Sequence, residues 1–248
     1  MDQQNDAERI RERLTQAQRM LVVTGAGISA ESGIPTFRGD DGYWKQHRAE
    51  ELASPEGFAR DSRLVWEWYN HRRRVIADCQ PNAAHRAVAK MEKLVPEFML
   101  VTQNVDGLHQ RAGSKNVMEI HGSIWRVRRA DNRGASYEDR TVFNDAEMPL
   151  CNSTGHLLRP AVVWFGETLP QDELECIDRF LDNEAIELCL VIGTSALFSY
   201  IVNFAFVVNR QGGMVIEVNP EPSLPSGCVD IIVREKAGDF LPLLLAKE

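Results

Sequence analysis

Short apolar runs recur along this chain, and they constrain its fold more than any other feature. The runs are rich in Val, Ile and Leu and are mainly apolar rather than strictly alternating with polar residues. That pattern is typical of strands in a parallel sheet covered on both faces, because both sides of such a strand are buried. We therefore expect strands at residues 20–24, 98–102, 116–120, 188–192, 214–218 and 229–233.

Apolar residues at helical spacing lie between these runs. The two clearest series are Ile10, Leu14, Ala17 and Leu21, and Ala84, Val88, Met91 and Val95. Asn82 stands just before the second series, where a side-chain cap is favoured. Strands that alternate with helices predict an α/β fold, a Rossmann-like doubly wound parallel sheet.

Two stretches interrupt that alternation. Residues 40–80 are charged and rich in aromatic side chains and predict a helical insertion, whereas residues 126–156 are polar without strong periodicity. We expect both to form a smaller lobe of a single domain that spans residues 1–248. The large lobe would contain residues 1–39, 81–125 and 157–248, and the small lobe residues 40–80 and 126–156.

Composition excludes several classes of protein. The 248 residues, 44% of them hydrophobic, are enough for a substantial core, and the net charge of -8 argues against a binder of nucleic acid or of anionic membranes. The five cysteines are scattered and form no Cys-x-x-Cys pair, which is typical of reduced thiols in the cytoplasm. Residues 1–19 are highly charged, so we expect no signal peptide.

One uncharged stretch is long enough to span a membrane. It covers residues 188–208, but Gly193 and its neighbours interrupt it, so we interpret it as a buried strand, a turn and a buried helix. We expect a cytoplasmic protein that is a monomer or a weak oligomer, with no membrane and no nucleic acid as partner.

Small and polar residues follow the predicted strands. They occupy residues 25–30, 103–106, 121–122, 193–195 and 219–221. In open parallel sheets, ligands bind outside the carboxyl ends of the strands. We expect the functional site there.

Gly25, Gly27 and Ala30 match the dinucleotide fingerprint directly after the first predicted strand. Glycines in this place also serve plain turns. A Rossmann dehydrogenase adds an acidic residue after its second strand, about 20 residues on. Here that distance reaches Asp40 and Asp41, which no strand precedes. The pattern favours a nucleotide cofactor over hydride transfer.

Other polar residues at the strand ends have both a structural and a functional interpretation. Asn104 and Asp106 could form a turn or line a site. His121 suits a general base in a cleft, although a lone histidine at a strand end is more often structural. His85 and His109 are further candidates, and spacing alone does not choose among the three.

Motifs spread over nearly the whole chain resemble the signature set of the sirtuins, which are NAD-dependent protein deacylases. In family order they are Gly25-Ala26-Gly27-Ile28-Ser29, Gly33-Ile34-Pro35-Thr36-Phe37-Arg38, Thr102-Gln103-Asn104-Val105-Asp106-Gly107-Leu108-His109, His121-Gly122, Arg159-Pro160 through Phe165-Gly166-Glu167, and Gly193-Thr194-Ser195.

The resemblance implies that NAD is the cofactor. Residues that would wrap its pyrophosphate and cover its nicotinamide are Gly25, Ala26, Gly27, Ser29, Ala30, Thr36, Phe37, Arg38 and Trp44. Residues that would orient the nicotinamide ribose are Gln103, Asn104 and Asp106. Residues that would hold the adenosine half are Gly193, Thr194, Ser195, Asn219, Glu221 and Ala237.

The resemblance also implies that His121 and Asn104 are catalytic, with His121 as the base. The substrates would be acylated protein lysines, and the products would be nicotinamide, deacylated lysine and O-acyl-ADP-ribose. The acyl-lysine would lie between the small lobe and residues Val162, Val163, Phe165 and Gly166, with its main chain paired by β-addition.

Residues 69–72 predict which acyl group is removed. Tyr69 and Arg72 lie three apart on one helical face, and a guanidinium binds a carboxylate with two hydrogen bonds. A run such as residues 72–74 is usually a solvated face. The spacing nevertheless resembles that of the sirtuins that remove succinyl and malonyl groups, and Ala53 lies where those enzymes keep a small residue in a wider acyl pocket. We expect desuccinylase or demalonylase activity alongside deacetylase activity.

The chain departs from the family pattern at two places. Most sirtuins hold a structural zinc with two Cys-x-x-Cys pairs, but the matching positions here are Arg129, Asn132, Cys151 and Thr154. Tetrahedral zinc needs about four such ligands, so we expect no metal and a small lobe held by apolar contacts and salt bridges. In addition, residues 196–201 lack the usual proline.

Two other functions use the same residues. An NAD-dependent ADP-ribosyltransferase would use the same pocket and His121, and the mass of the product would distinguish it from a deacylase. A non-enzymatic NAD-binding regulatory module is the third class, although it would not require Asn104, Asp106 and His121.

Overall fold

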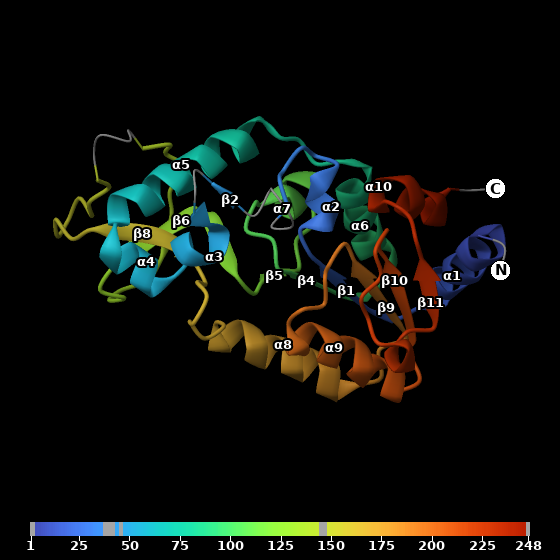
Figure 1. Cartoon of the computed structure of the whole chain (residues 1–248). Helices are drawn as coiled ribbons and strands as arrows, with labels where there is room; N and C mark the ends of the chain where they lie inside the picture. Colours follow the sequence, from blue (N-terminus) through green and yellow to red (C-terminus); the bar gives the residue numbers. More distant parts are fainter. Residues whose placement is uncertain (1–2, 37–42, 45–46, 144–147, 247–248) are drawn as a thin grey trace.

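A six-stranded parallel sheet forms the centre of the computed structural model (Figure 1), which describes residues 3–36, 43–44, 47–143 and 148–246. Its strands are β1 (Arg19–Thr24), β4 (Glu97–Thr102), β5 (Val117–Glu119), β9 (Leu188–Ile192), β10 (Met214–Val218) and β11 (Ile231–Val233). Every pairing within this sheet is parallel. The six predicted strands are confirmed, although β5 and β11 are shorter than expected.

The order of the strands is β11-β10-β9-β1-β4-β5. From β1 the chain first builds outward through β4 to β5, and it then returns to the other side of β1 to build β9, β10 and β11. The direction of building therefore reverses between β1 and β9. Such a switch point opens a crevice at the carboxyl ends of the two strands, where ligands bind.

Helical layers cover both faces of the sheet (Figure 1). One layer consists of α1 (Gln3–Gln16), α2 (Gly27–Ala30), α6 (Ala83–Leu94), α10 (Ala237–Phe240) and the 3-10 helix η3 (Leu241–Leu245). The other consists of α8 (Gln171–Asn183), α9 (Ser199–Arg210) and the 3-10 helix η2 (Ser226–Cys228). Met20 and Val22 of β1 pack with the first layer, and Leu21 and Val23 with the second. The doubly wound architecture is thus confirmed.

The two predicted helical series have different outcomes. Asn82 caps α6 by accepting hydrogen bonds from the amides of Ala84 and His85, as expected. In contrast, α1 ends at Gln16, so Ala17 and Leu21 lie outside it. Both residues are nevertheless buried, and Leu21 already belongs to β1. No helix within the described ranges combines the length and the apolar character needed to cross a bilayer.

A second group of elements lies beside the large sheet (Figure 1). Helices α3 (Ala49–Leu52), α4 (Pro55–Arg60) and α5 (Ser62–Asp78) pack on a sheet of β7 (Tyr137–Glu138), β6 (Gly122–Arg129) and β8 (Leu158–Val162). The short strands β2 (Tyr43–Trp44) and β3 (His47–Arg48) pair with each other, and α7 (Leu108–Ala112) also contacts this group through Leu108. The described part of the predicted insertion at residues 40–80 is therefore mainly helical. The boundaries of the two lobes stay a prediction.

Strand β6 was not expected from the sequence. Its pairing with β8 shifts register between Ser123 and Val127, and the neighbouring residues Ile124 and Trp125 are both buried. An irregularity of this kind breaks the period of two by which a half-buried strand is recognised.

Arg73 lies at the centre of this group with no exposed surface. Its guanidinium donates hydrogen bonds to the carbonyls of Ile124 and Thr141, and Asp139 lies 4.0 Å away. Three aromatic rings surround it with centroids at 5.4 to 5.9 Å: Trp66, Trp125 and Phe143. Burial lowers the pKa of Arg73 to about 10, so it stays charged at neutral pH. The expectation that this arginine run is a solvated face is wrong for Arg73.

We expect Arg73→Met to lower the free energy of unfolding by about 3 kcal/mol, because the buried carbonyl of Ile124 and the partly buried carbonyl of Thr141 lose a charged donor while the volume is nearly kept. Chemical denaturation measures the change. The matched control is Arg74→Met on the exposed side of α5, for which we expect a change within about 0.5 kcal/mol. Equal changes in the two variants would contradict the role of Arg73.

Candidate active site

Three glycines bring two loops into backbone contact at the switch point. The amide of Gly25 donates to the carbonyl of Ile192 at 3.0 Å, and that of Gly27 donates to the carbonyl of Gly193 at 2.8 Å. A Cβ on Gly27 would lie 2.7 Å from Cα of Gly193. Gly193 itself has φ +57°, and a Cβ there would lie 2.5 Å from the nitrogen of Ile28. Only glycine fits at both positions, so these glycines set the distance between the loops.

Asn104 and Asp106 do more than form a turn. The side-chain nitrogen of Asn104 donates to the carbonyl of Gly25 at 3.0 Å and to Oγ of Ser29 at 3.2 Å. Oγ of Ser29 in turn donates to the carboxylate of Asp106 at 2.8 Å, which also accepts from the amide of Leu108. Burial raises the pKa of Asp106, while these two hydrogen bonds and the charge of a nearby arginine oppose the rise. The network joins the ends of β1 and β4.

A second set of contacts extends from β4 to β10. Gln103 donates from its side chain to Oγ1 of Thr194 at 2.9 Å, and the carbonyl of Thr194 accepts from the side chain of Asn219 at 2.7 Å. Ser195 follows as a half-buried residue. The residues predicted for the nicotinamide ribose and for the adenosine half thus lie in one continuous row.

Several other predicted cofactor residues lie at the margins of this row. Glu221 is exposed, with its amide on the side chain of Asn219, and Ala237 is buried where α10 packs against α2. The remaining residues are Ala26 and Thr36, which are half-buried, and Ala30, which is exposed. Phe37 and Arg38 lie outside the described residues, as does the side chain of Trp44.

The structure separates the three candidate histidines. His85 and His109 are fully buried with rings 4.9 Å apart, and burial lowers their pKa values to about 4 and about 3. They are therefore neutral and serve inside the fold, bound to hydroxyls of Ser29 and Thr24. His121 instead is half-buried in the turn between β5 and β6.

The ring of His121 is held in one tautomer. Its Nδ1 lies 3.0 Å from the carbonyl of Gln103, which is only an acceptor, so Nδ1 carries the proton and Nε2 carries the lone pair. Burial lowers the pKa of His121 and the hydrogen bond to Gln103 opposes the shift, which favours the neutral ring at pH 7. His121 therefore has an acceptor nitrogen and can take up a proton.

Two aromatic residues beside His121 were missed. The phenol oxygen of Tyr200 lies 2.6 Å from Nε2 of His121, and the ring of Phe198 lies 5.7 Å from the imidazole. The only signal in the sequence was the missing proline between residues 196 and 201.

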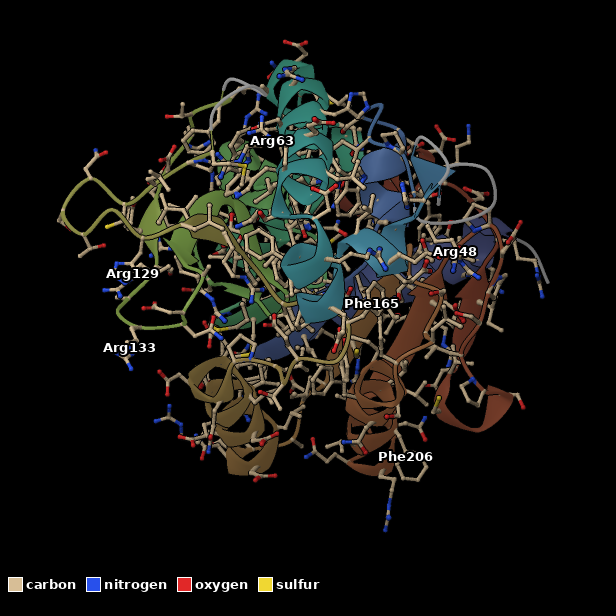
Figure 2. All side chains as sticks on the ribbon, turned by 60° about the vertical axis from the view of Figure 1, so that its left-hand side comes forward. Arg48, Arg63, Arg129, Arg133, Phe165 and Phe206 are labelled. Carbon is tan, nitrogen blue, oxygen red and sulfur yellow. The ribbon has the colours of Figure 1, made fainter. Side chains whose placement is uncertain are left out.

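The segment after β8 connects His121 to the small helices. Val163 donates its amide to the carbonyl of His121 at 2.9 Å, and Phe165 donates its amide to the carbonyl of Ala53 at 2.9 Å. Figure 2 shows Phe165, which is exposed, beside the helices α3 and α4. Val162 is buried, whereas Gly166 is exposed with φ +88°. The predicted substrate segment thus bridges both groups of elements.

Tyr69 and Arg72 share one face of α5, and Tyr69 lies under that segment. Tyr69 is fully buried, and its phenol oxygen accepts from the indole nitrogen of Trp164 at 2.9 Å. Arg72 is half-buried with its guanidinium 5.1 Å from the ring of Trp68. Burial raises the pKa of Tyr69 while the charge of Arg72 opposes the rise, which places the two groups in one electrostatic environment. Ala53 is buried nearby, bonded to Phe165.

The four positions of the family's zinc ligands lie among ion pairs and hydrogen bonds. Asp131 pairs with Arg129 and lies 3.8 Å from His156, and Asn132 accepts from Arg128. Within the described ranges, no group of three or more His, Cys, Asp or Glu side chains could hold a metal ion. The expectation of a zinc-free lobe stays a prediction, to be tested by elemental analysis.

The residues at the switch point fit a dinucleotide. The two loops are glycines in close backbone contact, and the side chains around them are amides and hydroxyls with one carboxylate, Asp106. Neutral donors and a close backbone are suited to a pyrophosphate and two riboses.

Comparison with known proteins gives one family. The model of the Sir2 family matches residues 25–199. An NAD-dependent protein deacylase of Aquifex aeolicus (strain VF5) is 50% identical over 222 residues, which cover 90% of this chain and 92% of that protein. A protein of the same name from Pyrococcus furiosus is 46% identical over 239 residues, 94% of each chain.

Solved structures agree with these relatives. A crystal structure of a complex of a Sir2 homologue with NAD superposes with a TM-score of 0.89 at 41% identity, covering 96% of this chain and 92% of that chain. A mutant Sir2 homologue in complex with 2'-O-acetyl ADP ribose gives the same score and identity over 99% of this chain and 96% of that chain.

We expect Gly27→Ala to weaken NAD binding at least tenfold and to lower the free energy of unfolding by about 1 to 3 kcal/mol, because the added Cβ forces the two loops apart. Calorimetric titration and chemical denaturation measure the two effects. Gly227→Ala is the control, since no atom lies within 4 Å of a Cβ there. Wild-type NAD affinity in Gly27→Ala would show that the loop spacing does not form the site.

Proposed function

The chain belongs to the Sir2 family and is an NAD-dependent protein deacylase, and from this premise we propose that His121 is the general base of deacylation. The observation that carries the proposal is the tautomer of His121. Its Nδ1–H is fixed on the carbonyl of Gln103, so Nε2 is the basic atom. The products would be deacylated lysine, nicotinamide and O-acyl-ADP-ribose.

NAD, when bound, supplies the ribose that receives the acyl group and the nicotinamide that leaves. His121 would accept a proton from a ribose hydroxyl at Nε2, a step for which a neutral imidazole near pH 7 is suited. The low polarity that lowers its pKa also excludes water from the reacting sugar.

Asn104 would orient the same ribose. Its side-chain nitrogen is fixed by the carbonyl of Gly25 and by Ser29, so its carbonyl oxygen is held in one direction. Asp106 fixes Ser29 in turn, which makes the carboxylate a support for the amide. The residues from Gly193 to Ser195, with Asn219, would hold the adenosine half of the cofactor.

An acylated peptide would lie against residues 162–166. The amides of Val163, Trp164 and Phe165 already donate to the carbonyl of His121, to the carboxylate of Glu167 and to the carbonyl of Ala53, respectively. A peptide that adds to this segment would therefore use its own amides as donors to carbonyls of the segment. A cytoplasmic location and a monomeric or weakly oligomeric state remain predictions from composition.

Removal of the base tests this function directly. We expect the wild-type protein to deacylate an acetyl-lysine peptide only with NAD, and His121→Ala to lower the rate by about 10² to 10⁴, the usual contribution of a positioned base. Mass spectrometry follows peptide and nucleotide together. His156→Ala, on an exposed loop, is the control and should keep the wild-type rate. An ADP-ribosylated peptide in place of O-acyl-ADP-ribose would instead favour the transferase.

The pair of Tyr69 and Arg72 supports a preference for acidic acyl groups. The phenol oxygen of Tyr69 accepts a hydrogen bond from Trp164, so its O–H group can donate one to a substrate. Arg72 brings a positive charge to the same face of the helix. A carboxylate at the end of a succinyl or malonyl chain could accept from both. Because both groups are shielded from solvent, the attraction would be screened less than at the surface.

We expect Arg72→Met to lower kcat/KM for a succinyl-lysine peptide by about 10- to 100-fold, the value of a lost charge-assisted hydrogen bond, and to leave the acetyl-lysine peptide within about threefold. Competition between both peptides in one reaction measures the preference. Arg74→Met on the exposed side of α5 is the matched control. An unchanged ratio of succinyl to acetyl turnover would rule out Arg72 as the selective group.

A further inference from the structure

Tyr200 lies against the nitrogen that the proposed function assigns to catalysis. It is the second residue of α9, and its phenol oxygen is 2.6 Å from Nε2 of His121. Its ring is stacked on Phe198 with centroids 5.4 Å apart at 12°, and it also contacts Phe204 of the same helix. The half-buried side chain is thus held by neighbours on both sides.

The chemistry of the two side chains decides whether His121 or Tyr200 donates the hydrogen bond between them. Nδ1 of His121 donates to the carbonyl of Gln103, so Nε2 has a lone pair and no proton in the neutral ring. Tyr200 must therefore be the donor. Burial raises the pKa of Tyr200 to about 12, which keeps the phenol protonated at neutral pH.

Nε2 has a single lone pair in the plane of the ring. It accepts one strong hydrogen bond, which goes to Tyr200 in this structure. A ribose hydroxyl that gives its proton to His121 needs the same lone pair. The phenol and the sugar hydroxyl are thus alternative donors to one atom.

We propose that Tyr200 is a positioning residue that occupies Nε2 of His121 in the NAD-free enzyme and is displaced from it by the ribose hydroxyl. The inference rests on the proposed role of His121 and adds a competing donor to it. The carbonyl of Gln103 fixes the productive tautomer, and the phenol of Tyr200 occupies the free Nε2 before the cofactor arrives. The enzyme therefore gives up the hydrogen bond from Tyr200 each time NAD binds. The departure from the family at residues 196–201 thereby has a consequence for cofactor affinity.

The loop before Tyr200 has room for such a displacement. Leu197 is 82% exposed and Phe198 is 37% exposed, whereas the rest of α9 packs on the sheet through Ile201 and Phe204. Rotation of the Tyr200 side chain away from His121 would disturb these exposed neighbours and leave the buried part of the helix in place.

Tyr200→Phe keeps the ring and removes only the competing donor. We expect KM for NAD to fall by about 3- to 10-fold, the value of one neutral hydrogen bond, with kcat within about threefold of the wild type. Tyr137→Phe, on the exposed strand β7, is the matched control and should change neither constant. An unchanged KM, or a loss of kcat of tenfold or more, would overturn the competition.

Nitrogen NMR of the imidazole tests the contact without any turnover. In the NAD-free wild type, we expect the Nε2 resonance of His121 to carry the shift of a hydrogen-bonded acceptor, and Tyr200→Phe to move it toward that of a free nitrogen. His121→Ala assigns the signal. Identical spectra of wild type and Tyr200→Phe would overturn the inference.

The activity of His121→Ala and the NMR spectra together separate this inference from the function on which it rests. Full deacylase activity of His121→Ala would overturn the general base, and the displacement with it, even where NMR still shows the hydrogen bond. Loss of activity in His121→Ala together with identical NMR spectra would overturn only the role of Tyr200.

Discussion

The backbone contact between Gly27 and Gly193 is the constraint on which the rest of the site depends. The sheet order leaves a crevice between β1 and β9, and the two loops close its floor to hydrogen-bonding distance. That distance lets Gln103, at the end of β4, reach Thr194 in the loop after β9. A side chain on either glycine would separate the loops and with them both polar groups.

Around this floor, buried polar groups are joined into networks rather than left alone. Asp106 accepts from Ser29, which also receives the amide of Asn104, and His85 and His109 fill the space behind them in neutral form. Most of these groups have hydrogen-bond partners, which lowers the cost of burying them and rigidifies their surroundings, whereas Nδ1 of His109 is buried without one. The rigid half of the site is therefore built from side chains that need not change their protonation.

Much of the fold could be predicted because burial leaves a local trace in the sequence. The strands of the parallel sheet are mainly apolar, and Asn82 precedes its helix. The register shift in β6 interrupts the alternation of apolar and polar residues by which that strand could have been predicted. Arg73 is buried although its neighbours in sequence are charged, so the sequence did not indicate its burial. Within the site, family motifs indicated His121, but its contact with Tyr200 joins residues 79 positions apart, which no local pattern encodes.

The two halves of the site differ in charge although the chain as a whole is acidic. On the side proposed for the cofactor, burial favours the neutral form of His121, and the side chains around the glycine loops are amides, hydroxyls and the buried Asp106. On the side proposed for the acyl group, Arg72 brings a cation beside the buried phenol of Tyr69. The net charge of -8 is the sum over many groups, most of them solvated, and the fields of solvated groups fall off within about 8 Å at physiological salt. A partly buried guanidinium is screened less, so under the proposed function the local field at the acyl group would be set mainly by Arg72 and not by the sum over the chain.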